Sequence, residues 1–188
     1  MEKKIVIGLT GQIACGKGVI KKHLMEIHGA SDYRFSTILR DLLKRLHLEL
    51  TRENLIHIST ILRQNFGDDL LAHAMAGDIK NDEQPFLVID GIRRLADIKF
   101  LKTIPEFKLV RIVANEKLRH ERVVSRNENA GDDQKTFADF LEDQQQETEI
   151  QIPEVMATAD YEIINEGTLD ELNKNVDDII ADIKKHNN

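Results

Sequence analysis

A lysine flanked by glycines near the N-terminus has the spacing of a phosphate-binding loop. Residues 11–18 read Gly-Gln-Ile-Ala-Cys-Gly-Lys-Gly, and they match the pattern G-x-x-x-x-G-K-[ST] except at its last position. Glycines let the backbone turn so that successive amide N–H groups point at phosphate oxygens, and the lysine ammonium bridges the β- and γ-phosphates. We therefore expect this loop to bind the polyphosphate of ATP. The residues expected to do so are Gly11, Gln12, Ile13, Ala14, Cys15, Gly16, Lys17, Gly18 and Val19.

A second, acidic position suits a metal ion. Residues 86–90 read Phe-Leu-Val-Ile-Asp, which is typical of a buried strand whose final carboxylate holds Mg²⁺ directly or through water. Gly18 replaces the hydroxyl residue that usually shares this metal ion. The residue after Asp90 is Gly91, whereas ATP-driven motors commonly place a second acid there to activate water. The sequence therefore favours phosphate transfer over ATP hydrolysis, with Lys17 and Asp90 as catalytic residues.

Three arginines on one predicted helix are candidates for stabilising a transferring phosphate. Arg119, Arg122 and Arg126 are spaced so that they share one helix face. Phosphate transfer develops charge on the oxygens of the transferred group, which arginine neutralises. We expect Arg122 and Arg126 to be catalytic in this way. For Arg119 we favour the alternative, in which it belongs to a solvated helix face and forms ordinary ion pairs. The polar loop 127–135 is expected to close over the site, within a lid of about residues 115–150.

Further arginines are candidates for binding the acceptor of the phosphate. Arg34, Arg40 and Arg63 precede Asp90 in a helical stretch of about residues 34–80. Guanidinium groups bind phosphate bidentately, so this stretch is expected to form an acceptor lobe, with ordinary surface arginines as the alternative. The Gly-Ile-Arg-Arg that follows Asp90 resembles the Asp-Gly-x-x-Arg turn of nucleoside monophosphate kinases, in which the arginine binds the acceptor's phosphate. Arg93 is assigned this role.

The pattern of apolar residues predicts one α/β domain that positions these groups. β-Branched runs alternate with helical periodicities along the whole chain, which is typical of a parallel sheet with helices on both faces. Ligands bind to such sheets at the carboxyl ends of the strands. Ser36 and Asn115 are predicted N-caps, and Thr51 is predicted to begin a further helix. Strands are predicted over residues 4–9, 33–35, 85–89, 109–113 and 161–164, and helices over 17–27, 36–46, 51–66, 68–79, 95–104, 115–127, 136–147 and from 168 onward.

Composition excludes several classes of function. Acidic side chains outnumber basic ones by 33 to 26 among 188 residues, which gives a formal net charge of −7. This balance argues against a nucleic-acid binder, which normally carries a basic excess or stripe. Cys15 is the only cysteine, and no apolar stretch approaches the roughly 18 residues of a membrane helix. We expect a cytoplasmic protein with no nucleic-acid or membrane partner, and the sequence leaves the oligomeric state open.

Taken together, the motifs resemble those of adenylate-kinase-related and dephospho-CoA-kinase-like P-loop proteins. The resemblance rests on the phosphate loop, on Val-Ile-Asp-Gly-Ile-Arg at residues 88–93 and on Ala-Asp-Tyr-Glu-Ile-Ile-Asn-Glu-Gly-Thr-Leu at residues 159–169. It implies a three-layer fold with a five-stranded parallel sheet, ATP and Mg²⁺ as cofactors, a helical acceptor lobe and an arginine-bearing lid. It also implies that the loop from Asn165 to Gly167 lies beside the adenine. A Gly-Lys-Gly ending is the form seen in adenylate kinases, which hold the metal more through water.

These expectations converge on a small-molecule kinase. The favoured reaction moves the γ-phosphate of ATP to a (deoxy)nucleoside monophosphate or a similar nucleotide-like small molecule. Dephospho-CoA kinase is an alternative, although the Asp-x-Asp that supplies the base in true dephospho-CoA kinases is replaced here by Arg34-Phe35-Ser36. An acceptor that is already a phosphate needs no strong base. A nucleotide-binding regulatory protein without transferase activity is the alternative from another class.

Overall fold

The computed structural model describes residues 4–126, 132–146 and 149–187, and a parallel sheet forms its centre. The strands are β1 Ile5–Thr10, β2 Ser31–Arg34, β3 Phe86–Asp90, β4 Phe107–Val113 and β5 Tyr161–Ile164. They pair in parallel in the order β2-β3-β1-β4-β5, so the expected five-stranded parallel sheet is confirmed. β1 lies between β3 and β4, so the loop after β1 opens where the strand order reverses. Parallel sheets bind their ligands at this point.

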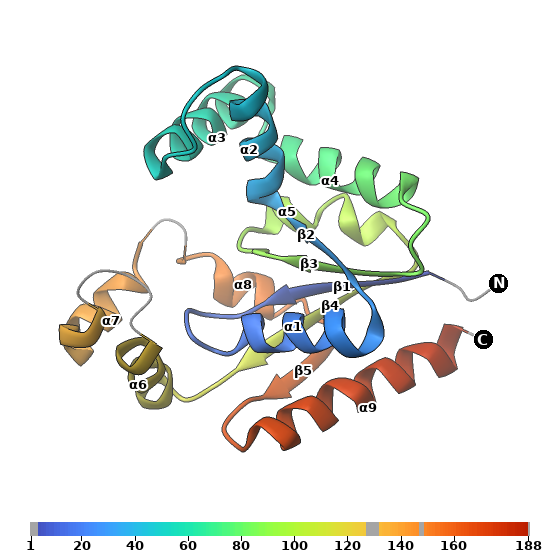
Figure 1. The fold of residues 1–188 in the computed structure, drawn as a ribbon, viewed down its shortest axis with the longest axis vertical. Helices are drawn as coiled ribbons and strands as arrows, with labels where there is room; N and C mark the ends of the chain where they lie inside the picture. The colour runs from blue at the N-terminus through green and yellow to red at the C-terminus, as the bar shows by residue number, and fades with distance from the viewer. Residues whose placement is uncertain (1–3, 127–131, 147–148, 188) are drawn as a thin grey trace.

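Helices cover both faces of the sheet (Figure 1). Ile7 and Leu9 of β1 belong to an apolar cluster with side chains of α1 and α9. Val6, which directly precedes Ile7, belongs to the opposite cluster with side chains of α2 and α4. Successive side chains of a strand point to opposite faces, so one run supplies both layers of the core. The helices are α1 Lys17–His28, α2 Phe35–Arg45, α3 Arg52–Phe66, α4 Leu70–Asn81, α5 Leu95–Ile98, α6 Glu116–Arg126, α7 Phe137–Asp143, α8 Ile152–Met156 and α9 Leu169–Asn187.

Two helical segments extend from the sheet. α2 and α3 form an arm at the top of Figure 1, and α6 and α7 form a second projection at its lower left. α3 has no fully buried residue, and it packs on the core through Leu55, Ile58 and Leu62, which are partly buried. The arm falls within the stretch predicted as the acceptor lobe, and α6 and α7 fall within the predicted lid. Residues 127–131 of the predicted lid loop lie outside the described residues.

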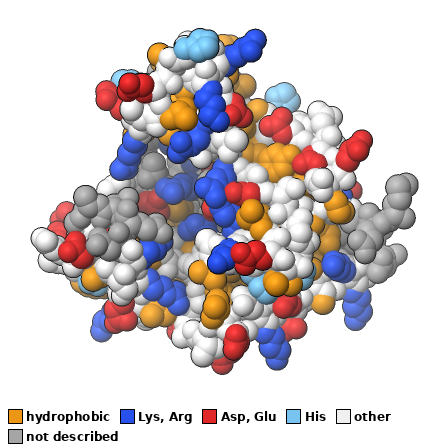
Figure 2. Space-filling model, viewed as in Figure 1, with side chains coloured by type: hydrophobic (Ala, Val, Ile, Leu, Met, Phe, Trp, Pro, Cys, Tyr) orange, Lys and Arg blue, Asp and Glu red, His pale blue; other side chains and the backbone are white. Residues whose placement is uncertain are grey.

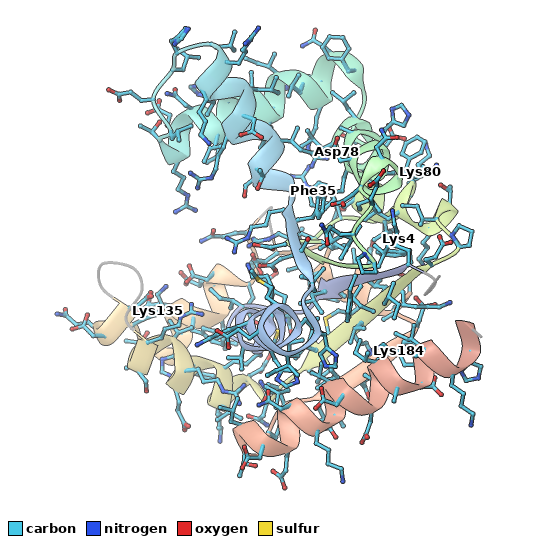
Figure 3. All side chains as sticks on the ribbon, turned by 45° about the vertical axis from the view of Figure 1, so that its right-hand side comes forward. Lys4, Phe35, Asp78, Lys80, Lys135 and Lys184 are labelled. Carbon is cyan, nitrogen blue, oxygen red and sulfur yellow. The ribbon has the colours of Figure 1, made fainter. Side chains whose placement is uncertain are left out.

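One of the two predicted helix caps is wrong. Oδ1 of Asn115 accepts a hydrogen bond from the Lys117 N–H at 2.9 Å, so Asn115 caps α6 as predicted. α3 begins directly after Thr51, whose side chain accepts a hydrogen bond from the Asn54 N–H at 3.1 Å. Ser36 does not cap α2, because the helix begins at Phe35 directly after β2, with Arg34 as an extended N-cap residue. The Phe35 side chain is only 8% exposed and lies at the foot of α2 (Figure 3). Burial of an aromatic ring, not a capping hydroxyl, therefore sets this boundary.

The segment from β3 to β5 departs further from the sequence predictions. The helix predicted over residues 95–104 is the short α5 followed by a 3₁₀ turn at Leu101–Thr103. α8 was not predicted; its Ile152 and Val155 are buried, and a proline stands in its first turn. Within the described residues, no helix combines the length and the apolarity needed to cross a bilayer.

Candidate nucleotide-binding and acceptor site

The turn from β1 to α1 is built on two glycines with positive φ. Gly11 has φ 154°, and Gly16, the N-cap of α1, has φ 110°. A β-carbon on Gly11 would lie 2.6 Å from the carbonyl oxygen of Ile112, and one on Gly16 would collide with the side-chain amide of Asn165. L-residues with a β-carbon rarely adopt this backbone conformation. The geometry therefore requires glycine at both positions of the predicted phosphate loop.

Lys17 folds back over this loop. Its Nζ donates hydrogen bonds to the carbonyl oxygen of Gly11 and, at 3.0 Å, to that of Gln12. The same atom lies 3.6 Å from Sγ of Cys15, which is a buried packing residue. Lys17 lines both of two neighbouring cavities. One ammonium-bearing side chain is therefore shared by the two hollows.

The first hollow, the donor cavity, has a volume of about 760 Å³. It brings together part of the predicted phosphate loop, the predicted lid arginines Arg122 and Arg126, and the predicted adenine loop. Gly11, Gln12, Ile13 and Cys15 of the predicted loop are not among its lining residues. The lining residues are Ala14, Gly16, Lys17, Gly18, Val19, Arg122, Ser125, Arg126, Asn165, Gly167, Leu169 and Leu172.

The polar groups of the donor cavity fit a nucleotide polyphosphate. Nη2 of Arg122 donates to the carbonyl oxygen of Asn165 at 3.0 Å, whereas Nη1 of Arg122 is buried and has no hydrogen-bond partner among the described residues. A buried donor without a partner costs about 1–3 kcal/mol, which an anion at this position would recover. The glycines of the loop leave room for close approach to its backbone amides, and the N-terminus of α1 favours negative charge.

Arg119, the third arginine of the predicted lid face, has a structural role. Its side chain is 1% exposed and does not line the donor cavity. It donates to the carbonyl oxygen of Ala114 at 3.1 Å, to that of Ile13 at 3.3 Å and to Oε1 of Gln144 at 2.8 Å. Burial lowers the pKa of Arg119, and the nearby Glu116 partly opposes this. The guanidinium group thus ties α6 to the phosphate loop and to the end of α7.

The second hollow, the acceptor cavity, has a volume of about 660 Å³ and is rich in arginine. Figure 2 shows Lys and Arg side chains gathered in the hollow below the α2–α3 arm. Two carboxylates, Asp90 and Asp97, also line this cavity. Its arginines are Arg34, Arg52, Arg63, Arg93 and Arg94, and its apolar residues are Phe35, Leu39, Leu55, Ile56 and Leu71. The cavity therefore combines strong positive charge with an apolar wall.

Three of the four predicted acceptor arginines line this cavity. Nε of Arg34 donates to Asp32 at 3.0 Å, and Arg93 donates to Glu149. Arg63 donates to the carbonyl oxygen of Asp68 and lies 3.3 Å from Oδ1 of Asp97, yet its Nε is buried with no hydrogen-bond partner in the part of the chain that the structure describes. An orphaned guanidinium nitrogen in an arginine-rich cavity fits an anionic ligand.

Arg40 is the predicted acceptor residue that the structure does not bring into the cavity. It is exposed on α2 and is not a lining residue. Sequence reasoning missed Arg52 and Arg94, both of which line the cavity. Counted from Asp90, the pattern Asp-Gly-x-x-Arg ends at Arg94 and not at Arg93, so the motif itself indicates Arg94.

Asp90 is paired with a buried lysine that sequence reasoning also missed. Nζ of Lys21 lies 3.3 Å from Oδ2 of Asp90 and 3.3 Å from Oδ2 of Asp32. The Lys21 side chain is 9% exposed, and both carboxylates are 22% exposed. Lys21 follows Lys17 by four residues, so the two ammonium groups share one face of α1. The pairing fixes the Asp90 carboxylate at the wall of the acceptor cavity, which Lys17 also lines, and the carboxylate oxygen atoms are suitable ligands for Mg²⁺.

The fold and the phosphate loop define a P-loop protein with the fold of small-molecule kinases. A gluconokinase from Sinorhizobium meliloti 1021 superposes with a TM-score of 0.59 at 11% identity, covering 99% of this chain and 97% of the other. A dephospho-CoA kinase from Campylobacter jejuni gives 0.55 at 16% identity, over 97% and 98%. A shikimate kinase from Acinetobacter baumannii, in complex with shikimate, gives 0.53 at 18% identity, over 96% and 95%. At such identities the likeness shows the fold alone.

The chain belongs to the UPF0200 family. A UPF0200 protein from Thermococcus gammatolerans is 31% identical over 184 residues, which cover 95% of each chain. A UPF0200 protein from Staphylothermus marinus is 26% identical over 185 residues, covering 98% of this chain and 96% of the relative. No protein-family model matches the chain. The family name states no activity, so the function has to be argued from the site.

The buried Lys21 provides the first prediction. Replacing it with methionine keeps the length of the side chain but removes the ammonium group between the two carboxylates, which leaves Asp32 with Arg34 alone and takes the Lys21 ion pair away from Asp90. Breaking a buried ion pair from one side costs about 3 kcal/mol or more. We expect Lys21→Met to lower the free energy of unfolding at pH 7 by about 3 kcal/mol, measured by urea denaturation.

Lys22→Met is the matched control, since Lys22 is the next residue and its ion pair with Glu26 is largely exposed. The control should change stability by less than about 0.5 kcal/mol. Equal effects of the two substitutions would contradict the structural role of Lys21.

Proposed function

We propose that this chain is an ATP-dependent phosphotransferase that moves the γ-phosphate to a (deoxy)nucleoside monophosphate or a similar nucleotide-like small molecule. The observation that carries the proposal is that Lys17 lines both the donor and the acceptor cavity. Transfer requires donor and acceptor on either side of the moving phosphate, with positive charge beside it. Lys17 is the residue proposed to supply this charge.

The donor cavity suits ATP. Backbone amides of the phosphate loop would hold the polyphosphate, and the Asn165–Gly167 loop would lie beside the adenine. Arg122 and Arg126 are proposed to neutralise charge on the transferring group, which is worth about 10³ to 10⁵ in rate where an arginine finger does so. Bound Mg²⁺ supplies further neutralisation between the phosphates. Asp90 is the residue proposed to hold this ion, directly or through water.

The acceptor cavity suits an anionic acceptor with an apolar part. Arg34, Arg63 and Arg93 are proposed to bind its phosphate, because planar guanidinium groups match phosphate geometry. The apolar wall that includes Phe35 and Leu39 offers a surface for a planar base. A phosphate oxygen is nucleophilic at neutral pH, so this acceptor needs no strong base. The cluster of arginines favours a phosphate acceptor over a neutral sugar hydroxyl.

Dephospho-CoA kinase is the second candidate, and one observation favours it. Asp32 of β2 shares the partner Lys21 with Asp90, so a second carboxylate lies close to Asp90, although Asp32 is not among the lining residues of the acceptor cavity. This carboxylate is also 3.0 Å from Nε of Arg34. Because two cations already hold Asp32, we rank this candidate below transfer to a phosphate.

An ADP-release assay over a panel of acceptors tests the proposal. The panel contains ribo- and deoxyribonucleoside monophosphates and dephospho-CoA, with Mg²⁺ and ATP in excess. We expect acceptor-dependent turnover with at least one monophosphate and its loss in Lys17→Ala. Turnover with dephospho-CoA alone would favour the second candidate. Saturable ATP binding without turnover on any acceptor would leave the regulatory alternative, in which Lys17→Ala loses a partner instead of a reaction.

Gly18 provides a prediction about the metal ion. Apart from its chain neighbours and the backbone of its own helix, no atom of the described residues lies within 4 Å of a β-carbon built on Gly18, so a serine fits without a clash. Its hydroxyl would stand where most P-loops place a Mg²⁺ ligand. We expect Mg²⁺ to strengthen ATP binding more in Gly18→Ser than in the unaltered chain. The ratio of the ATP dissociation constant without Mg²⁺ to that with Mg²⁺ should therefore increase several-fold. Gly18→Ala, which adds the β-carbon alone, should leave this ratio unchanged, and an equal increase in both variants would contradict the explanation.

Arg63 provides a prediction about the acceptor. Arg63→Lys keeps the charge but removes the planar fork and the buried Nε. One charged hydrogen bond is worth about 1.5–3 kcal/mol, so kcat/KM for the acceptor should fall roughly 10- to 100-fold while the KM for ATP changes little. Steady-state kinetics on the best acceptor measure this.

Arg45→Lys is the control, because Arg45 is exposed on α2 and does not line the acceptor cavity. This substitution should leave kcat/KM for the acceptor within about twofold of the unaltered chain. Arg40→Lys tests the sequence-based assignment of Arg40. A loss comparable to that of Arg63→Lys would support it, and unchanged kinetics would contradict it.

A further inference from the structure

Two histidines and an aspartate meet away from the donor and acceptor cavities. His23 and His28 lie on α1, and Asp177 lies on α9. Nε2 of each histidine is 2.7 Å from the same atom, Oδ1 of Asp177. The two imidazole rings meet edge to face, with their centroids 5.6 Å apart. In the described parts of the chain, this is the one group of three such side chains whose ligand atoms all lie within 4.8 Å of one another.

We propose that His23, His28 and Asp177 form a binding site for a divalent transition-metal ion of the Zn²⁺ type. Imidazole nitrogen and carboxylate oxygen are favourable ligands for Zn²⁺ and Co²⁺, whereas Mg²⁺ takes oxygen ligands. Ligand atoms around a tetrahedral Zn²⁺ ion stand about 3.4 Å apart, given metal–ligand distances of about 2.1 Å. The 2.7 Å separations are hydrogen-bond distances. Binding therefore exchanges the bridging protons for the ion and moves the carboxylate back by less than about 1 Å.

Burial distinguishes this group from a chance cluster on the surface. The side chains of His23 and His28 are 11% and 16% exposed, so packing restricts their rings. The ring of His28 also contacts that of Phe86, with centroids 5.9 Å apart. The Asp177 side chain is 47% exposed, which leaves a path for the ion and room for water as a fourth ligand.

The position of the group indicates what the ion would do. α1 begins at the phosphate loop and α9 begins beside the donor cavity, where Val19 and Leu169 both line the hollow. The histidine–aspartate group joins the same two helices farther along their length. None of its members lines the donor or the acceptor cavity. The ion would therefore cross-link two helices that carry the donor cavity, without touching the substrates, and would stabilise the folded chain by mass action.

Metal titration of the full-length chain, stripped of metal and free of nucleotide, tests this proposal. Calorimetry with Zn²⁺ should show one saturable site per chain, and Co²⁺ should give the visible absorption of a low-coordinate ion. The Tm should rise with Zn²⁺ concentration. His23→Gln and His28→Gln should each weaken Zn²⁺ binding roughly tenfold or more. Loss of a residue that only orients a metal ligand typically lowers metal affinity by about 10- to 100-fold, and these substitutions remove a ligand itself.

Asp177→Asn separates metal binding from simple hydrogen bonding. The asparagine oxygen still accepts hydrogen bonds from both imidazoles, but the anionic ligand is lost, so Zn²⁺ binding should fall while the Tm of the metal-free chain changes little. His186→Gln is the matched control. His186 lies 3.4 Å from Asp182 on the same helix α9, but among the described residues this pair has no third side chain placed to bind a metal ion with it. It should bind Zn²⁺ as the unaltered chain does. Folded chain that takes up neither ion, or binding that survives all three substitutions, overturns the proposal.

Discussion

The geometry of the phosphate loop depends on one buried side chain, that of Asn165. Its Nδ2 donates to the carbonyl oxygen of Cys15 at 2.8 Å, and its backbone N–H donates to that of Val113 at 2.8 Å. Its own carbonyl oxygen accepts from Arg122. Asn165 is 6% exposed, so these bonds face little competition from water. The bonds to Val113 and Arg122 use backbone groups of Asn165, whereas the bond to Cys15 needs a side-chain N–H. A carboxylate of the same shape has no N–H to donate, so the connection to the loop requires the amide.

Elements with a strong local signal could be predicted from the sequence. Apolar runs located β1, β3 and β4, because a buried parallel strand is apolar on both faces. The edge strand β2 reads Ser-Asp-Tyr-Arg, and its prediction over residues 33–35 overlaps it only in part. The phosphate loop was predictable since its glycines and Lys17 obey a strict spacing. The start of α2 was not, because it depends on the burial of Phe35, which no local pattern reports. The short α8 has too few residues to display a helical periodicity.

Site residues that act through tertiary contacts escaped the sequence for a related reason. Lys21 and Arg119 read as ordinary charges on helix faces, yet both are buried, and each holds parts of the site that are far apart in the chain. Lys21 joins residues of β2 and β3, and Arg119 joins α6 to the phosphate loop and to α7. One-dimensional spacing reveals which charges share a helix face, but not what lies opposite them. Arg52 belongs to the same class, because only the fold of the arm brings it to the acceptor cavity.

The distribution of charge matters more here than its sum. The chain carries a formal net charge of −7, which disfavours long polyanions over most of its surface. The acceptor cavity nevertheless gathers five arginines against two carboxylates, one of which is already paired with Lys21. A cleft lined by one sign of charge concentrates small ions of the opposite sign. A compact anion is attracted by the arginines of this cavity, whereas an extended polyanion is also exposed to the net negative charge of the rest of the chain. This difference favours a small phosphorylated molecule over a long polyanion as a ligand of the cavity.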